Sequence, residues 1–209
     1  MPTVGGALKV LPNRLRFGAL LALALAQSGC VQQAVLENDV RSAQWKARTL
    51  STAADLSLAH SALSAQLVEL EALYQRDPGD ARVLGLLERG YALMARGFIE
   101  LRRLEALASG DLVRADAEQA LRTDAESRAR YYRDKLGGGA TARAGSGLER
   151  DFAEPEAACA RHDRTAYEAQ LNTLLAQPEA AAEQRLELTL SRKLAAAWLT
   201  PNVAARCKF

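Results

Sequence analysis

Two runs of mostly apolar side chains, on either side of residues 77–80, constrain the fold more than any other feature of the sequence. Within each run the spacing alternates between three and four residues. This spacing places the members of a run on one face of an α-helix. The sequence therefore predicts two long helices, each with one apolar face. The first run comprises Leu56, His60, Leu63, Leu67, Leu70 and Tyr74, and the second comprises Leu84, Leu87, Tyr91, Met94, Phe98 and Leu101.

The four residues between the runs have the composition of a tight turn. Asp77 precedes Pro78, and the residue before a proline disfavours helical geometry, so the first helix should end there. Gly79 permits the turn, and the side chain of Asp80 can accept hydrogen bonds from the free N–H groups that begin the second helix. Helices joined by so short a turn lie antiparallel. The pairing should place Leu87, Tyr91 and Phe98 against Leu63, Leu67 and Leu70.

The composition favours an all-α protein made of antiparallel helix hairpins. The 209 residues include six prolines, and no run of alternating β-branched residues is long enough to predict a strand. The formal net charge is +2, but three basic residues lie in an N-terminal segment that we expect to be removed, which leaves 24 basic and 25 acidic residues. A nearly neutral protein has little electrostatic reason to bind nucleic acid.

Residues 1–29 have the order of a bacterial secretory signal peptide. Basic residues come first, an apolar run follows at 17–26, and small residues precede Cys30. The apolar run is too short to cross a membrane, which takes ~20 residues. Cleavage after Ala26 would give a soluble periplasmic protein, whereas the Ser-Gly-Cys sequence resembles a lipobox, and we favour lipidation of Cys30. The residue after the cysteine is Val31 and not an acidic residue, which suits a periplasmic protein that is anchored in the outer membrane.

The next two segments are predicted from polarity and helical spacing. Residues 30–52 should be a tether that becomes a first helix near Asn38. Residues 53–136 should be the helical core, and they end in a charged third helix at about 112–136. The charges of this third helix are expected to be solvated. Its buried side is predicted to comprise Leu121, Ala125, Ala129, Tyr132 and Leu136.

The C-terminal part is predicted to be a separate helical hairpin. Glycine-rich sequence begins at Gly137, and residues 137–150 should form a flexible linker. In the hairpin, residues 151–209, a fourth helix should open at Pro155 and run to about residue 176. A fifth helix should follow and end before Pro201.

Three cysteines are present in the chain. Lipidation would use Cys30 and leave two cysteines in an oxidising compartment. An antiparallel fifth helix returns to the start of the fourth, and the residues after Leu199 give the chain enough reach to close the gap. The sequence therefore predicts a disulfide between Cys159 and Cys207.

Candidate site residues are few. His60 belongs to an apolar stripe, and His162 lies near a cysteine and an aspartate without a fourth metal ligand in sequence. We expect no metal, no cofactor and no catalytic residue. Tyr91, Met94 and Phe98 form the most ligand-like cluster, although core packing explains them equally well.

The turn and the helices around it resemble known families. Residues 77–80, followed by Leu84, Leu87 and Tyr91, resemble the start of a tetratricopeptide repeat. The Ser-Gly-Cys leader, the sequences LEALYQRDPGD and GYALMARGFIE, and residues 128–132 are together similar to the T-component lipoproteins of TRAP transporters (tripartite, ATP-independent, periplasmic). The resemblance covers roughly residues 50–136 and 160–199.

This resemblance implies an all-α, tetratricopeptide-like helical array in the periplasm. It also implies that the partner is a periplasmic solute-binding protein of a TRAP transporter. The role implied is to help deliver organic ligands, hydrophobic ones among them. The chain is shortened in the middle, where the family has further helix pairs and this sequence has the glycine-rich segment.

Two functions follow as hypotheses, and neither is enzymatic. An adaptor would present a surface to the partner protein, and a filled core with an exposed apolar groove would favour it. A carrier would enclose a small apolar ligand, and a cavity of several hundred Å³ around Tyr91, Met94 and Phe98 would favour it. A general envelope scaffold is the remaining alternative.

Overall fold

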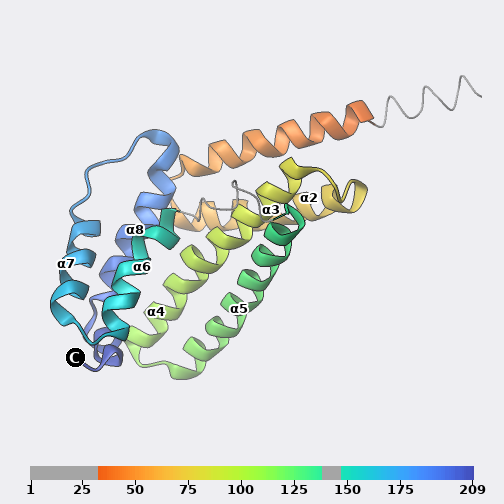
Figure 1. The fold of residues 1–209 in the computed structure, drawn as a ribbon. Helices are drawn as coiled ribbons and strands as arrows, with labels where there is room; N and C mark the ends of the chain where they lie inside the picture. Colours follow the sequence, from red (N-terminus) through yellow and green to blue (C-terminus); the bar gives the residue numbers. More distant parts are fainter. Residues whose placement is uncertain (1–32, 138–146) are drawn as a thin grey trace, which may run out of the picture. The chain divides into compact units, whose positions relative to one another are not determined.

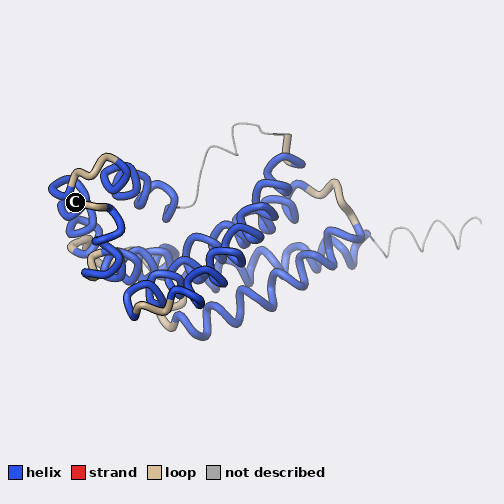
Figure 2. Tube along the Cα trace, turned by 90° about the horizontal axis from the view of Figure 1, so that it is seen from below, coloured by secondary structure: helices blue, strands red, loops and turns tan. Residues whose placement is uncertain are grey.

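The computed structural model describes residues 33–137 and 147–209 (Figure 1). Every regular element in these two ranges is a helix, and Figure 2 shows the helices joined by loops. The all-α prediction is therefore confirmed for the described residues. Residues 40–209 form one compact unit. Most of the predicted linker, residues 138–146, lies outside the described residues. Cys30 lies outside the described residues.

The first described helix spans residues 33–51. The predicted start near Asn38 is therefore too late. Between Val31 and Ala54 the sequence has neither proline nor glycine, so nothing in this segment interrupts a helix. Residues 40–51 of this helix belong to the compact unit, and Val40 and Ala43 are buried in it.

Helices α2 (Leu56–Arg76) and α3 (Ala81–Leu93) form the predicted antiparallel hairpin. The side chain of Asp80 accepts hydrogen bonds from the backbone N–H groups of Arg82 and Val83, which caps α3 as the sequence predicts. The Arg82 guanidinium also donates to the Asp80 carboxylate, at 2.7 Å between Nη2 and Oδ2. These hydrogen bonds lower the pKa of Asp80.

The two helices of the hairpin approach each other closely at Gly90. A Cβ atom at this position would lie 2.8 Å from Cδ2 of Leu67, so no larger residue fits without a shift of the leucine. Leu63 and Leu67 of α2 are buried, and Leu87 of α3 is fully buried. The seam thus contains leucines of both predicted runs, and Gly90, which is outside those runs, lets the backbones meet there.

The helix continues from α3 through a π-helical segment, η1 (Met94–Ile99), into α4 (Glu100–Ser109). The wider π turn rotates the helix that follows, so the buried face of α4 is not a straight continuation of the buried face of α3. Gly97 in this segment faces the C-terminal helices, where an added Cβ would lie 2.9 Å from Cδ1 of Leu190 and 3.3 Å from Cδ1 of Leu148.

Helix α5 (Leu112–Lys135) packs beside α3 and α4. Its seam includes the predicted Ala125, Ala129 and Tyr132, but Leu121 is 55% exposed and its assignment to the buried side is wrong. The seam instead contains the charged residues Glu118 and Arg122, which pair with α4. The expectation that the charges of α5 are solvated therefore fails for these two residues, whereas Asp124, Arg128 and Arg130 are exposed.

The buried carboxylate of Glu100 forms ion pairs with two arginines. It lies 2.6 Å from Nη2 of Arg103 and 2.9 Å from Nη1 of Arg122. Two guanidinium groups thus compensate one carboxylate that α4 removes from water. Paired charges can therefore occupy a helix seam. A search for apolar side chains alone selects Leu121 for this seam in place of the neighbouring Arg122.

The C-terminal helices differ from the prediction in their boundaries. Helix α6 (Gly147–Ala160) starts within the predicted linker and contains Pro155 in its interior, so the predicted helix start at Pro155 is wrong. Helix α7 (Arg164–Leu175) is separate, because Asp163 caps it by accepting from the N–H of Ala166. The single helix predicted for 155–176 is therefore two.

Helix α8 (Arg185–Trp198) follows a 3₁₀ turn, η3 (Ala182–Gln184), and packs against α4, α6 and α7. Its apolar residues Leu186, Leu190 and Leu194 are buried. Pro201 begins a short helix, α9 (Pro201–Ala204), which leads into η4 (Ala205–Cys207).

The disulfide between Cys159 and Cys207 is present, with 4.9 Å between the two Cα atoms. The predicted pairing is confirmed, but the route to it differs. Cys159 lies in the last turn of α6 and not near the start of a helix. The chain reaches Cys207 through α7, α8 and α9. The bond joins the end of the chain to α6.

Candidate functional site

An open apolar groove of about 550 Å³ lies between the first described helix and α2. It exists because α2 presents small side chains, Ala59, Ala62 and Ala65, where larger ones would fill the space. Trp45 and Leu58 at the groove are 69% and 66% exposed. The remaining lining residues are Lys46, Thr49, Leu50, Ala53, Gln66 and Glu69.

Polar contacts frame this groove. Nζ of Lys46 lies 2.6 Å from Oε2 of Glu69, an exposed ion pair that connects the two helices. Nε2 of the buried Gln66 donates to the carbonyl oxygen of Ala43 at 3.0 Å. Both contacts hold the first helix at a fixed position along α2. The groove thus has an apolar surface with polar contacts at its edges, as protein-binding sites do.

A second hollow, of about 380 Å³, shares Leu50 and Gln66 with the groove. Its walls come from the first helix, α2, α3, α6 and α8. Glu187 at its edge approaches the start of α6 so closely that a Cβ on Gly147 would lie 2.5 Å from the carboxylate oxygen. Burial raises the pKa of Glu187, and nearby Asp151 raises it further, while Arg150 opposes the shift.

The predicted cluster of Tyr91, Met94 and Phe98 lines neither hollow. Met94 and Phe98 are buried, and the ring of Phe98 packs edge-on against His60 at 5.3 Å between centroids. Tyr91 is half-buried, and its hydroxyl donates to Oε1 of Glu71 at 2.8 Å. The residues predicted as a ligand cluster therefore pack against other helices, and the two hollows are lined by other residues.

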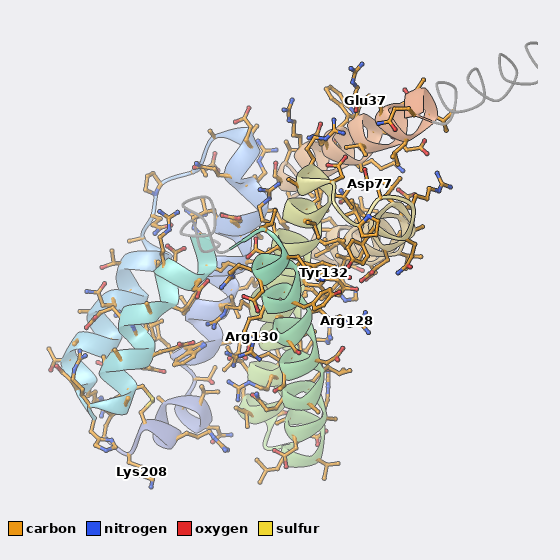
Figure 3. The ribbon with its side chains drawn as sticks, turned by 45° about the vertical axis from the view of Figure 1, so that its right-hand side comes forward. Glu37, Asp77, Arg128, Arg130, Tyr132 and Lys208 are labelled. Atoms are coloured by element: carbon orange, nitrogen blue, oxygen red, sulfur yellow. A yellow bond between two sulfur atoms is a disulfide. The ribbon has the colours of Figure 1, made fainter. Side chains whose placement is uncertain are left out.

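Tyr91 belongs to a cluster of phenols around Glu71 that joins α2, α3 and α5. Oε2 of Glu71 accepts from the hydroxyl of Tyr132 at 2.7 Å. Nη1 of Arg128 donates to the Tyr91 hydroxyl at 3.2 Å. Figure 3 shows Tyr132 and Arg128 on neighbouring turns of α5, on the side toward α2. The hydroxyls of Tyr74 and Tyr131 lie 3.0 Å apart at the exposed edge.

The hydroxyls of Tyr91 and Tyr132 are held in their protonated form. Burial, followed by the hydrogen bond to Glu71, raises the pKa of Tyr132 and of Tyr91. A phenol with a raised pKa is a poor base and a poor nucleophile at neutral pH. The cluster therefore acts as a clasp between helices.

The two histidines have structural contacts. Nη1 of Arg102 lies 3.2 Å from Nε2 of His60, and burial together with Arg102 lowers the pKa of His60. Nδ1 of His162 contacts the carbonyl oxygen of Cys207. Within residues 33–137 and 147–209, no three side chains of the types that bind metals come together. In the same ranges, no helix combines the length and apolarity needed to span a bilayer.

Trp45, Leu58 and Ala62 are lining residues that the sequence did not indicate. Trp45 lies in the segment predicted to become the first helix, and Leu58 and Ala62 lie outside the run of larger apolar side chains on α2. A weak signal was available, because Ala59, Ala62 and Ala65 recur every third residue. Comparison of the chain with protein families, curated proteins and solved structures found no match. The resemblance to the TRAP T-component family therefore stays a prediction.

Proposed function

We propose that the protein is a non-enzymatic adaptor that binds the periplasmic solute-binding protein of a TRAP-type transporter. The observation that carries the proposal is the apolar groove between the first helix and α2. The core around Met94 and Phe98 is filled, and the apolar surface is on the outside, which is the arrangement that favours an adaptor over a carrier enclosing that cluster.

The groove has the composition of a protein-binding surface. Trp45 offers a large exposed ring, and tryptophan is enriched among residues that dominate binding energy. Alanines of α2 leave room for a partner side chain beside it. The ion pair of Lys46 and Glu69 provides a polar edge. The identity of the partner comes from the sequence resemblance to the T-component family.

The remaining parts of the proposal concern location and repeat architecture. A lipid on Cys30 would hold the protein at the outer membrane, within reach of periplasmic partners. The α2–α3 hairpin supports a tetratricopeptide-like unit, because the Asp-Pro-Gly-Asp turn joins two antiparallel amphipathic helices. We propose that this unit forms part of an array shortened relative to the family.

The affinity for the purified solute-binding protein of the same organism's TRAP transporter tests the role of the groove. Trp45→Ala should weaken binding about 30-fold, corresponding to ~2 kcal/mol for a central tryptophan. Val113→Ala is the matched control, because Val113 is 83% exposed on α5 and outside the groove. No binding by the wild-type protein, or equal weakening by both variants, would contradict the proposal.

A further inference from the structure

The cavity of about 380 Å³ has a different character from the groove. Its walls are mainly leucines, with Leu63 and Leu70 from α2, Leu93 from α3 and Leu186 from α8. Its volume lies in the lower part of the range of small-molecule sites. An apolar space bounded by five helices is suited to one flexible hydrocarbon chain and is too small for a protein element.

Charged side chains also line the cavity. Arg89 of α3 and Arg150 of α6 line it, together with Glu187. Arg89 also lines an adjoining hollow of about 290 Å³ with Arg48 of the first helix. Neither Arg48 nor Arg89 has a side-chain hydrogen bond or ion pair with any residue in the described ranges, in contrast to Arg122 and Arg133, which pair with glutamates of the neighbouring helices.

Among the described residues that line the cavity, two are arginines, Arg89 and Arg150, and one is a carboxylate, Glu187. Asp151 adds a second carboxylate near Glu187, and Arg48 adds a third guanidinium group at the adjoining hollow. Burial raises the pKa of Glu187, which favours its neutral form. Guanidinium groups bind carboxylates through paired N–H donors, and this recognition is strongest beside an apolar surface that excludes water.

We propose that this cavity binds an amphipathic monoanion, with its hydrocarbon chain among the leucines and its carboxylate at Arg89 and Arg150. The site is independent of the adaptor role, because Trp45 and Leu58 do not line it. The protein therefore has one surface for a partner protein and one cavity for a small acidic amphiphile.

Titration calorimetry with decanoate on the full mature protein tests the proposal. Decanoate should bind at one saturable site, and decylamine should bind at least about tenfold more weakly, because it places a cation beside the arginines. The double variant Arg89→Gln/Arg150→Gln should lose about tenfold or more in decanoate affinity, through loss of charge-assisted hydrogen bonds, and should leave decanol binding unchanged. Arg130→Gln, at an exposed position on α5, is the control and should have no effect.

Two further variants keep the test decisive. Ala47→Phe would place a ring in the cavity wall and should abolish binding of both decanoate and decanol, provided that circular dichroism shows the helices intact. Loss of decanoate binding in Trp45→Ala would show that decanoate binds in the groove and would overturn the proposal. Equal affinities for decanoate and decylamine, or no saturable binding of decanoate, would overturn it as well.

Discussion

The helices from α2 to α5 and those from α6 to η4 are held together by different chemistry. In the first region, α5 is joined to α2 and α4 by carboxylates that accept from arginines and phenols, with Glu100 and Glu71 as the centres. In the second region, apolar and aromatic side chains around Tyr167 pack together, and a disulfide closes the chain at Cys207. Both regions are all-helical, so secondary structure alone does not reveal the difference.

This difference teaches where each region is vulnerable. A buried carboxylate is stable only while its partners remain, so loss of one arginine leaves a desolvated charge. A disulfide acts mainly by restricting the unfolded chain, so its loss leaves the folded contacts in place. The seam of the α2–α3 hairpin is apolar and should be the most sensitive of all, because it has no polar partner for a new charge.

The largest effect is expected from Leu87→Asp. Leu87 is fully buried in the seam between α2 and α3, and an unpaired carboxylate there should lower the free energy of unfolding by at least about 4 kcal/mol. Urea unfolding followed by circular dichroism measures the change. Val68→Asp, at a position 71% exposed on α2, should change it by less than about 0.5 kcal/mol. A cooperative transition at the wild-type urea midpoint in Leu87→Asp would refute the hairpin seam.

The disulfide should come next. The bond spans a sequence separation of 48 residues, and the double variant Cys159→Ser/Cys207→Ser should lose ~3–4 kcal/mol in the same unfolding measurement. Reductant should destabilise the wild-type protein by a similar amount and leave the variant unchanged. Alkylation of both thiols in protein prepared without reductant would show that the bond is absent.

A smaller loss is expected for Arg122→Met. Glu100 would keep Arg103 but lose the 2.9 Å contact across to α5, which should lower the free energy of unfolding by about 1–3 kcal/mol. Adding Glu100→Gln should recover part of the loss, because the carboxylate left with one partner is then removed. A double variant less stable than the sum of its single variants would argue against the charge-pair explanation.

The clasp around Glu71 predicts a dependence on alkaline pH. The folded-state pKa of Tyr132 is raised above the ordinary tyrosine value of 10.0, so the stability that its hydrogen bond contributes is complete below pH 10 and is lost as the pH rises toward the raised value. Tyr132→Phe should flatten this alkaline decline and have a smaller effect than the preceding variants. A decline of identical slope in the variant would exclude this phenol as its cause.

The sequence predicts the part of the fold in which apolar spacing and turn chemistry agree. Leu67, Leu87 and the cap at Asp80 could all be assigned in this way. Arg122 and Glu118 could not, because a charged side chain gives no apolar signal although its partner on α4 allows it into the seam. Pro155 was misassigned because proline favours a helix start, and here the helix continues past it, with Pro155 fully buried.

The groove and the cavity lay beyond sequence reasoning for another physical reason. The cavity is bounded by residues that are far apart in the chain, such as Ala47, Leu93 and Leu186. The groove is bounded by residues 45–69, where small alanines give only a weak signal. The π-helical segment that follows Leu93 and the close approach of Gly97 to Leu190 produce no recognisable sequence pattern. The disulfide could be predicted because the number of cysteines left few choices.

The adaptor role is tested most directly by photo-crosslinking in living cells. A benzoyl-phenylalanine placed at Trp45 should form a crosslink to the periplasmic solute-binding protein of the TRAP transporter, identified by mass spectrometry. The same group at Val113 should not, because that residue lies on α5, outside the groove. Absence of the solute-binding protein from the products at position 45, with the protein folded and the crosslinker incorporated, would contradict the proposal that this groove is its binding site.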